Sequence, residues 1–178
     1  DGGDDIAVAT IADAYRLDIA AASNGHLFVA TQEGRPGDPH DYRVIIRRST
    51  DGGTTWHQWA SFEDAKTRDP ALLVAEGAED RVFLAYEHQD WPHVEVRVAW
   101  SPLDVESGQF SSWTTVYSAE GHHILGLDLA CDAVNYDSYF LYLVFAADDG
   151  DGGDIHFARS IDQGDSFEAQ YTLASIAR

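Results

Sequence analysis

Residues 49–56 read Ser-Thr-Asp-Gly-Gly-Thr-Thr-Trp, and residues 160–167 repeat the pattern as Ser-Ile-Asp-Gln-Gly-Asp-Ser-Phe. In both stretches a serine, an aspartate and a glycine stand at every second position, and an aromatic residue closes the motif. An aspartate in a hairpin turn accepts hydrogen bonds from backbone N–H groups, and glycine supplies a positive φ angle. The two stretches therefore predict two equivalent β-hairpins, each anchored to its sheet by the aromatic side chain.

A third, longer copy of this turn lies between the other two. There, Ser101 is followed by Asp104, Gly108 and Trp113, as if the same turn carried an insertion. The residues that we expect to hold the three turns together are Ser49, Asp51, Gly53, Trp56, Ser101, Asp104, Gly108, Trp113, Ser160, Asp162, Gly164 and Phe167.

The three turns belong to a repeat that extends along nearly the whole chain. Asp18, Asp69 and Asp128 precede the three serines by 31, 32 and 32 residues, and each unit has four short apolar runs. Some runs alternate as strands do, most plainly residues 94–98 (Val-Glu-Val-Arg-Val). Four short strands per repeat are typical of β-propeller blades. We predict an all-β chain of three four-stranded antiparallel sheets, with blades at residues 13–62, 63–119 and 120–175 and an extra strand at residues 5–12.

Three blades do not close a ring, because closed propellers have about four to eight blades. Exposed strands and apolar blade faces promote association. We therefore expect either a homo-oligomer, in which two chains complete a six-bladed ring, or further blades in a longer parent chain. A β-sandwich with the same spacing is the alternative fold.

The composition argues against several classes of protein. The chain has 178 residues, 11 Lys+Arg against 31 Asp+Glu and a formal net charge of −20, and its 44% hydrophobic residues suffice for a packed core. Such negative charge repels phosphate backbones, which argues against nucleic-acid binding. No apolar run approaches the roughly 20 residues of a membrane span. The aspartate-rich surface, with Lys66 as the only lysine, suits an extracellular or cell-surface setting, although a GC-rich coding sequence explains the arginine preference equally well.

The three turns resemble the Asp-box (BNR) repeats of sialidase-like six- or seven-bladed β-propellers. In that family the box is structural and lies between the third and fourth strands of a blade, away from the active face. The resemblance therefore implies that the turn residues stabilise the fold and take no part in catalysis. Asp51→Ala is expected to lower stability and to leave ligand binding unchanged.

Ligand binding is expected on the loops at the other end of the blades. Arg16 and Arg68 precede corresponding inner strands, and an arginine pairs bidentately with a carboxylate. The resemblance implies three arginines around a sialic acid carboxylate, and residues 67–72 keep the Arg and Pro of one such motif. However, Gly126 stands where a third arginine would be expected, and no Tyr/Glu nucleophile pair is evident. Salt bridges within an aspartate-rich channel are the alternative role for the two arginines.

Two further loops carry candidate binding residues. Trp91 stands at a loop tip, where an exposed aromatic ring stacks on a sugar or docks a protein, and His88 lies beside it. A glycine-rich turn offers oxygen ligands of the kind that Ca²⁺ takes, without the spacing of an EF-hand. Its four carboxylates are those of Asp148, Asp149, Asp151 and Asp154. A solvated acidic hairpin is the alternative, and no other cofactor is expected.

Complete blade repeats without catalytic residues favour a secreted, non-catalytic propeller module that binds a glycan or a protein. The alternative is a fragment of an exo-sialidase-like glycoside hydrolase, whose other part supplies the missing groups. A purely structural repeat of a surface protein is a third hypothesis.

Overall fold

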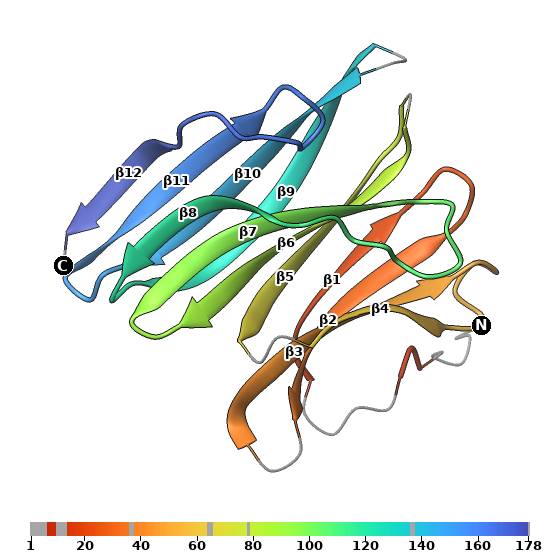
Figure 1. Cartoon of the computed structure of the whole chain (residues 1–178), viewed down its shortest axis with the longest axis horizontal. Helices are drawn as coiled ribbons and strands as arrows, with labels where there is room; N and C mark the ends of the chain where they lie inside the picture. The colour runs from red at the N-terminus through yellow and green to blue at the C-terminus, as the bar shows by residue number, and fades with distance from the viewer. Residues whose placement is uncertain are drawn as a thin grey trace, which may run out of the picture.

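The computed structural model describes residues 7–9, 14–35, 38–63, 66–77, 79–135 and 138–177. In these ranges the regular secondary structure consists of β-strands (Figure 1). The strands are β1 (Ala14–Ala21), β2 (Leu27–Arg35), β3 (Asp38–Ser49), β4 (His57–Phe62), β5 (Thr67–Ala75), β6 (Arg81–Asp90), β7 (His93–Pro102), β8 (Thr114–Glu120), β9 (His123–Asn135), β10 (Ser138–Asp148), β11 (Gly152–Ser160) and β12 (Tyr171–Ala177). Across the described ranges no helix is long and apolar enough to cross a membrane.

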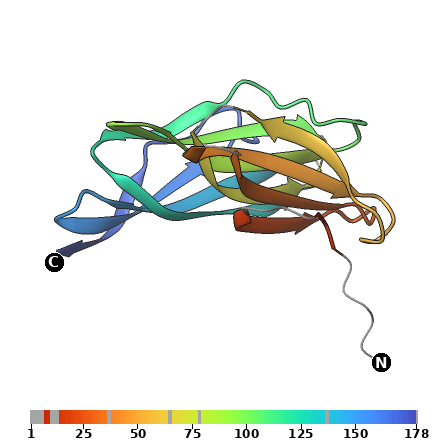
Figure 2. The same ribbon diagram turned by 90° about the horizontal axis from the view of Figure 1, so that it is seen from below.

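The strands form three four-stranded antiparallel sheets, which we call the first blade (β1–β4), the second blade (β5–β8) and the third blade (β9–β12). The blades follow one another in chain order, with the first at one end of the molecule and the third at the other (Figures 1 and 2). The prediction of an all-β fold built from propeller blades is confirmed. Of the proposed extra strand at residues 5–12, only residues 7–9 are described, and they form no strand. The rest lies outside the described residues, so that strand stays a prediction.

Two hydrophobic cores lie between the blades and follow from the alternation of each strand. Phe28 and Trp59 of the first blade pack edge to face, with ring centroids 4.9 Å apart, in the core shared with the second blade. In the core between the second and third blades, Phe83 meets Tyr139 with centroids 6.0 Å apart. Fully burying one such side chain contributes roughly 1.5–3 kcal/mol. The cores therefore hold neighbouring blades face to face.

The first and third turns have the same set of hydrogen bonds. In the first turn, Ser49 Oγ donates to Asp51 Oδ1 (2.8 Å), while Gly53 N donates to Ser49 Oγ (2.8 Å) and Thr55 N donates to Asp51 Oδ1 (2.8 Å). The glycine has a φ of 91°. The backbone bond from Thr55 is the main reason that the pKa of Asp51 is lowered to about 2.

In the third turn, Ser160 Oγ donates to Asp162 Oδ1 (2.8 Å), Gly164 N donates to Ser160 Oγ (2.8 Å) and Ser166 N donates to Asp162 Oδ1 (2.9 Å). Its glycine has a φ of 90°. Burial opposes ionisation of Asp162, but the hydrogen bonds from Ser166 and Ser160 outweigh it and lower the pKa.

The second turn differs, as its insertion suggests. Ser101 keeps its role, because Gln109 N donates to its Oγ (2.9 Å). Asp104 is exposed, and none of the described residues donates a hydrogen bond to its carboxylate. Gly108 N donates to the carbonyl oxygen of Trp59 in the first blade (2.8 Å). Trp113 remains 51% exposed, so it covers the turn less than predicted.

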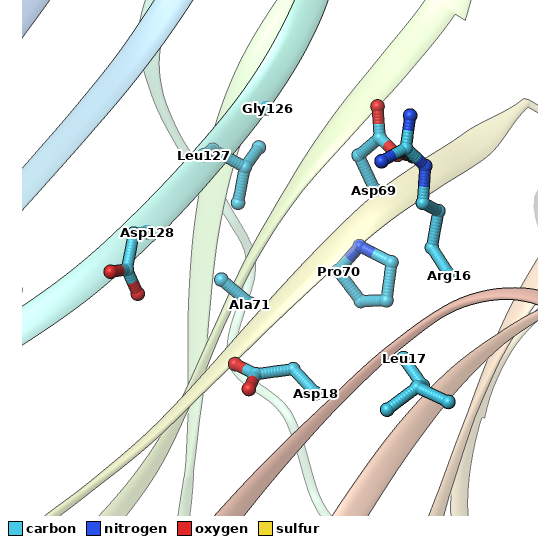
Figure 3. A pocket seen from close by; sticks show the side chains of 9 residues that line it. All are labelled: Arg16, Leu17, Asp18, Asp69, Pro70, Ala71, Gly126, Leu127 and Asp128. Carbon is cyan, nitrogen blue, oxygen red and sulfur yellow. Dashed lines mark ion pairs between the residues drawn. The ribbon is translucent and has the colours of Figure 1, made fainter.

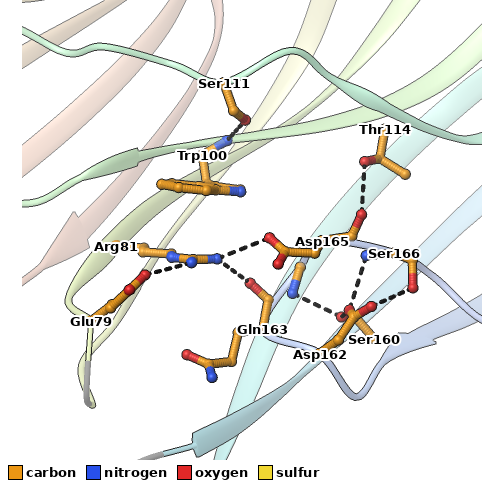
Figure 4. A network of polar contacts seen from close by, with 11 residues as sticks. Glu79, Arg81, Trp100, Ser111, Thr114, Ser160, Asp162, Gln163, Asp165 and Ser166 are labelled. Carbon is orange, nitrogen blue, oxygen red and sulfur yellow. Dashed lines mark hydrogen bonds and ion pairs between the residues drawn. The ribbon is translucent and has the colours of Figure 1, made fainter.

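The turns also connect neighbouring blades. Arg81 of the second blade lies 3.7 Å from the ring centroid of Trp100 and donates to Gln163 O (2.9 Å) in the third turn (Figure 4). The same guanidinium pairs with Asp165 (3.3 Å) and Glu79 (2.6 Å). We call this group the Arg81 clasp, and it joins the second blade to the third.

A similar connection joins the first blade to the second. Arg48 NH1 donates to Val105 O (2.6 Å), and Trp59 Nε1 donates to the same oxygen (3.0 Å). In both pairs of blades, side chains of the earlier blade therefore bind backbone oxygens in the turn of the later one.

Candidate functional site

The innermost strands of the three blades approach one another around two hollows. The first, which we call the polar hollow, has a volume of about 240 Å³. It is lined by Tyr15, Arg16, Gln32, Tyr42, Arg68, Asp69, Glu87, Gln89, His123 and Ile124, which come from all three blades.

The second, which we call the channel hollow, has a volume of about 220 Å³. Figure 3 shows Arg16 and Asp69 pointing toward each other in it, with Asp18 and Asp128 apart from them. Asp18 Oδ2 accepts a hydrogen bond from Leu72 N of the second blade (2.7 Å). Asp18 therefore helps to hold the inner strands of the first and second blades together.

Asp69 occupies a strained position at the mouth of the polar hollow. Its φ is 45°, a value that residues other than glycine seldom adopt, and the pairing of β5 with β6 is irregular between Arg68 and Ala71. The side chain of Gln32 accepts a hydrogen bond from Asp69 N (3.0 Å) and supports this conformation. Such backbone strain costs about 1–3 kcal/mol and concentrates at functional sites. The geometry therefore marks Asp69 as a candidate site residue.

The carboxylate of Asp69 pairs with Arg16 Nε at 3.0 Å. Burial raises the pKa of Asp69, while the positive charges of Arg16 and Arg68 oppose that rise. Arg16 thus forms a salt bridge with an aspartate, which is the alternative role that the sequence analysis gave for the two arginines.

Glu87 is the buried carboxyl group of the polar hollow. It lies on β6, lines the hollow and is 4% exposed. Burial raises its pKa to about 7; the charge of Asp69 adds to that rise and Arg68 opposes it. The residue therefore gains or loses a proton near neutral pH.

Arg68 lies next to Glu87, because the two residues are direct partners on β5 and β6. Its guanidinium stacks on the ring of Tyr42 at 4.7 Å from the centroid. Arg68 Nε is buried and meets no hydrogen-bond acceptor among the described residues. A positive group and a protonatable acid thus stand side by side, and the Nε–H of the arginine is unused.

The repeat places Gln32 and Glu87 at equivalent positions. Leu27 pairs with Ser49 and Val82 pairs with Ser101, and in each case the polar residue follows five positions later on the second strand. Neither residue was predicted as a site residue, although both begin stretches where ligand loops are expected. The available signal was a polar residue at the same distance after the start of the apolar run in each strand.

The remaining predicted residues lie around this region. Trp91 is 60% exposed and stacks on the ring of His123, which lines the polar hollow. His88 is the β6 partner of Thr67 and lies outside the lining of the polar hollow. Arg16, Arg68 and Asp69 are therefore brought together, and Trp91 stands at their edge.

The predicted calcium ligands lie at the turn between β10 and β11, where Asp148 pairs with His123 of β9. Asp148 Oδ1 accepts a hydrogen bond from Gly150 N (2.7 Å), and Asp149 Oδ1 accepts one from Asp151 N (3.0 Å). Asp151 and Asp154 line a separate hollow. In the part of the chain that the structure describes, no group of three or more His, Cys, Asp or Glu side chains is arranged to hold a metal ion. Calcium binding stays a prediction.

No family model matches the sequence, and no curated protein matches it. Solved structures do match the fold. The α-L-arabinanase of Penicillium chrysogenum, solved with arabinobiose, superposes with a TM-score of 0.69 at 13% identity, over 93% of this chain and 50% of its own. The α-L-arabinofuranosidase of Fusarium graminearum, solved with an iminosugar inhibitor, gives a TM-score of 0.61 at 14% identity, with the same coverage of both chains. This chain thus spans about half the length of these enzymes and has the fold of part of a β-propeller.

Proposed function

We propose that the chain is part of a β-propeller that binds a saccharide, with one sugar ring in the polar hollow. The observation that carries this proposal is the buried residue Glu87 beside Arg68, whose Nε is buried and meets no hydrogen-bond acceptor among the described residues. A buried polar group without a partner costs about 1–3 kcal/mol. The hydroxyl groups of a sugar donate and accept hydrogen bonds, so they satisfy both side chains at once. The hollow of about 240 Å³ suits a small ligand better than a large one.

The finer parts of the sequence hypothesis belong to the same proposal. We propose that the turns are Asp-box repeats of a sialidase-like propeller; the identical hydrogen bonds of the first and third turns support this. We also propose that the protein works outside the cell or on its surface, where a net charge of −20 with one lysine is well tolerated.

Glycoside hydrolysis is the second candidate, and the pKa of Glu87 favours it. Most glycoside hydrolases use two carboxyl groups, one of which stays protonated near neutral pH to act as the acid. A Glu87 with a pKa of about 7 meets that requirement, and Asp69 provides a second carboxyl group nearby. The rest of the ring would then complete the site.

Titration with arabinobiose, the ligand seen in a structural neighbour, tests the proposal. Glu87→Ala and Arg68→Ala are expected to weaken binding about 10-fold or more, because a hydrogen bond to a charged group contributes about 1.5–3 kcal/mol. Asp104→Asn, in the exposed second turn, serves as the control and should bind as the wild type does. Binding that survives both hollow substitutions would exclude the polar hollow.

The same samples separate binding from hydrolysis. If Glu87 acts as an acid, the wild type releases arabinose, the rate falls as pH rises through about 7, and Glu87→Gln binds without turnover. Tight binding with no arabinose released favours the non-catalytic role.

A further inference from the structure

Trp91 has a fixed position beside the polar hollow. It lies in the turn between β6 and β7 and is 60% exposed. Its ring stacks on His123 of the third blade, with centroids 5.4 Å apart and planes 21° apart. His123 also lines the polar hollow. The exposed indole and the hollow therefore share a wall residue.

Contacts with the end of β8 and the residue after it hold this turn in place. Gly121 N donates to Pro92 O (2.8 Å), and His93 Nδ1 lies 3.5 Å from Glu120 Oε1. One face of the indole is covered by His123, so the ring is presented as a platform rather than as a free side chain.

Exposure of one apolar residue needs no explanation by itself. A fixed aromatic platform next to a polar hollow matches the chemistry of a sugar. A sugar ring has a C–H face that packs on aromatic rings and a rim of hydroxyl groups that form hydrogen bonds. Trp91 offers the first kind of contact, and Glu87 with Arg68 offers the second.

We propose that Trp91 forms a second sugar subsite, so that the ligand is an oligosaccharide of at least two rings. This inference rests on the proposed saccharide binding in the polar hollow. One ring occupies the hollow and the neighbouring ring packs on the free face of Trp91, with His123 between the two subsites.

The test compares L-arabinose, arabinobiose and arabinotriose on the whole chain by calorimetry. The indole N–H signal of Trp91 is followed by NMR and assigned by its loss in Trp91→Phe. We expect arabinobiose to bind about 10-fold or more tightly than arabinose. Trp91→Ala should abolish that difference and leave arabinose binding unchanged, while Trp91→Phe should keep part of it. Trp113→Ala is the matched control, since Trp113 is 51% exposed and stacks under Arg97 away from the hollow lining.

The outcomes distinguish a failure of the Trp91 subsite from a failure of saccharide binding in the polar hollow. If Arg68→Ala abolishes arabinobiose binding and Trp91→Ala does not change it, the second subsite is wrong and the polar hollow stands. An equal loss of arabinose and arabinobiose binding in Trp91→Ala also overturns the subsite. If none of the three sugars binds or shifts the Trp91 signal, the result counts against saccharide binding and against the subsite with it. A signal shift caused only by an added protein would assign Trp91 to protein docking instead.

Discussion

At the scale of single residues, Glu87 links the fold to pH. The residue is 4% exposed, and burial raises the pKa of its carboxyl group from 4.5 to about 7. Between these two values the folded chain keeps a proton that the unfolded chain has lost. Stability falls with rising pH wherever the folded state binds more protons, so this residue lowers the free energy of unfolding as pH increases from about 4.5 to about 7.

Glu87→Gln is expected to remove this contribution. Below pH 4.5 the variant and the wild type should be nearly equally stable, and at pH 8 the variant should be more stable by about 1–3 kcal/mol. Urea unfolding of the variant and the wild type at both pH values measures their difference in stability. Because both proteins contain the many other acidic groups, this difference cancels their effect. Asp104→Asn, an exposed carboxylate, should show no such pH-dependent gain. Equal stability of Glu87→Gln and wild type at pH 8 would contradict the raised pKa.

At the scale of secondary-structure elements, the third turn is pressed against the neighbouring blade. A Cβ atom on Gly164 would lie 2.5 Å from Phe83 Cε1 and 2.9 Å from Leu141 Cδ1, and the residue has a φ of 90°. Gly150 offers a matched comparison: its φ is 93°, and a Cβ atom there would meet nothing within 4 Å. The two glycines share a backbone conformation and differ in packing.

Gly150→Ala should therefore cost only the strain of placing a residue with a Cβ atom at a positive φ, about 1 kcal/mol. Gly164→Ala should cost about 1–3 kcal/mol more because of the steric clash. Chemical unfolding of both variants measures the two losses. Similar losses in the two variants would mean that the third turn does not pack tightly on the second blade.

The blade sheets could be predicted from the sequence because each signal is local. Alternation along residues 94–98 and the turn at 49–56 depend on neighbouring residues only, and both lie where the sequence placed them. The polar hollow could not be predicted in this way. Asp69 N binds a side chain 37 positions earlier, and Glu87 has a raised pKa because three blades bury it. A single strand sequence carries no information on which polar residues neighbouring blades bring together.

At the scale of the whole molecule, the two outer faces differ in chemistry. On the third blade, Val144 pairs with Phe157, and Phe157 pairs with Tyr171, so the three side chains form a row across the outer face. Val144 is 38% exposed and Tyr171 is 57% exposed. On the first blade, the buried carboxylate of Glu33 pairs with Arg47 at 2.6 Å, so that face carries an ion pair where the third blade carries apolar side chains.

We therefore expect two chains to associate through their apolar third-blade faces. The predicted six-bladed ring of two chains would instead place the third blade of each chain against the first blade of the other. Val144→Asp is expected to convert an associated wild type into a monomer at micromolar concentration, because it places a charge in the contact. Analytical ultracentrifugation measures the change, with the surface variant Asp104→Asn as control. A well-folded wild-type monomer would contradict the association and leave additional blades as the way to cover this face.

The Arg81 clasp makes the order of the blades matter for how the molecule comes apart. Its side chain is 9% exposed, and it binds both a carbonyl oxygen of the third turn and the carboxylate of Glu79 beside its own blade. Detaching the third blade would expose this cation to water and leave it paired with Glu79. Detaching the first blade would break the bonds that Arg48 and Trp59 make to Val105 O. In both pairs the earlier blade contributes side chains and the later blade contributes the turn, so the three blades are coupled in one direction along the chain.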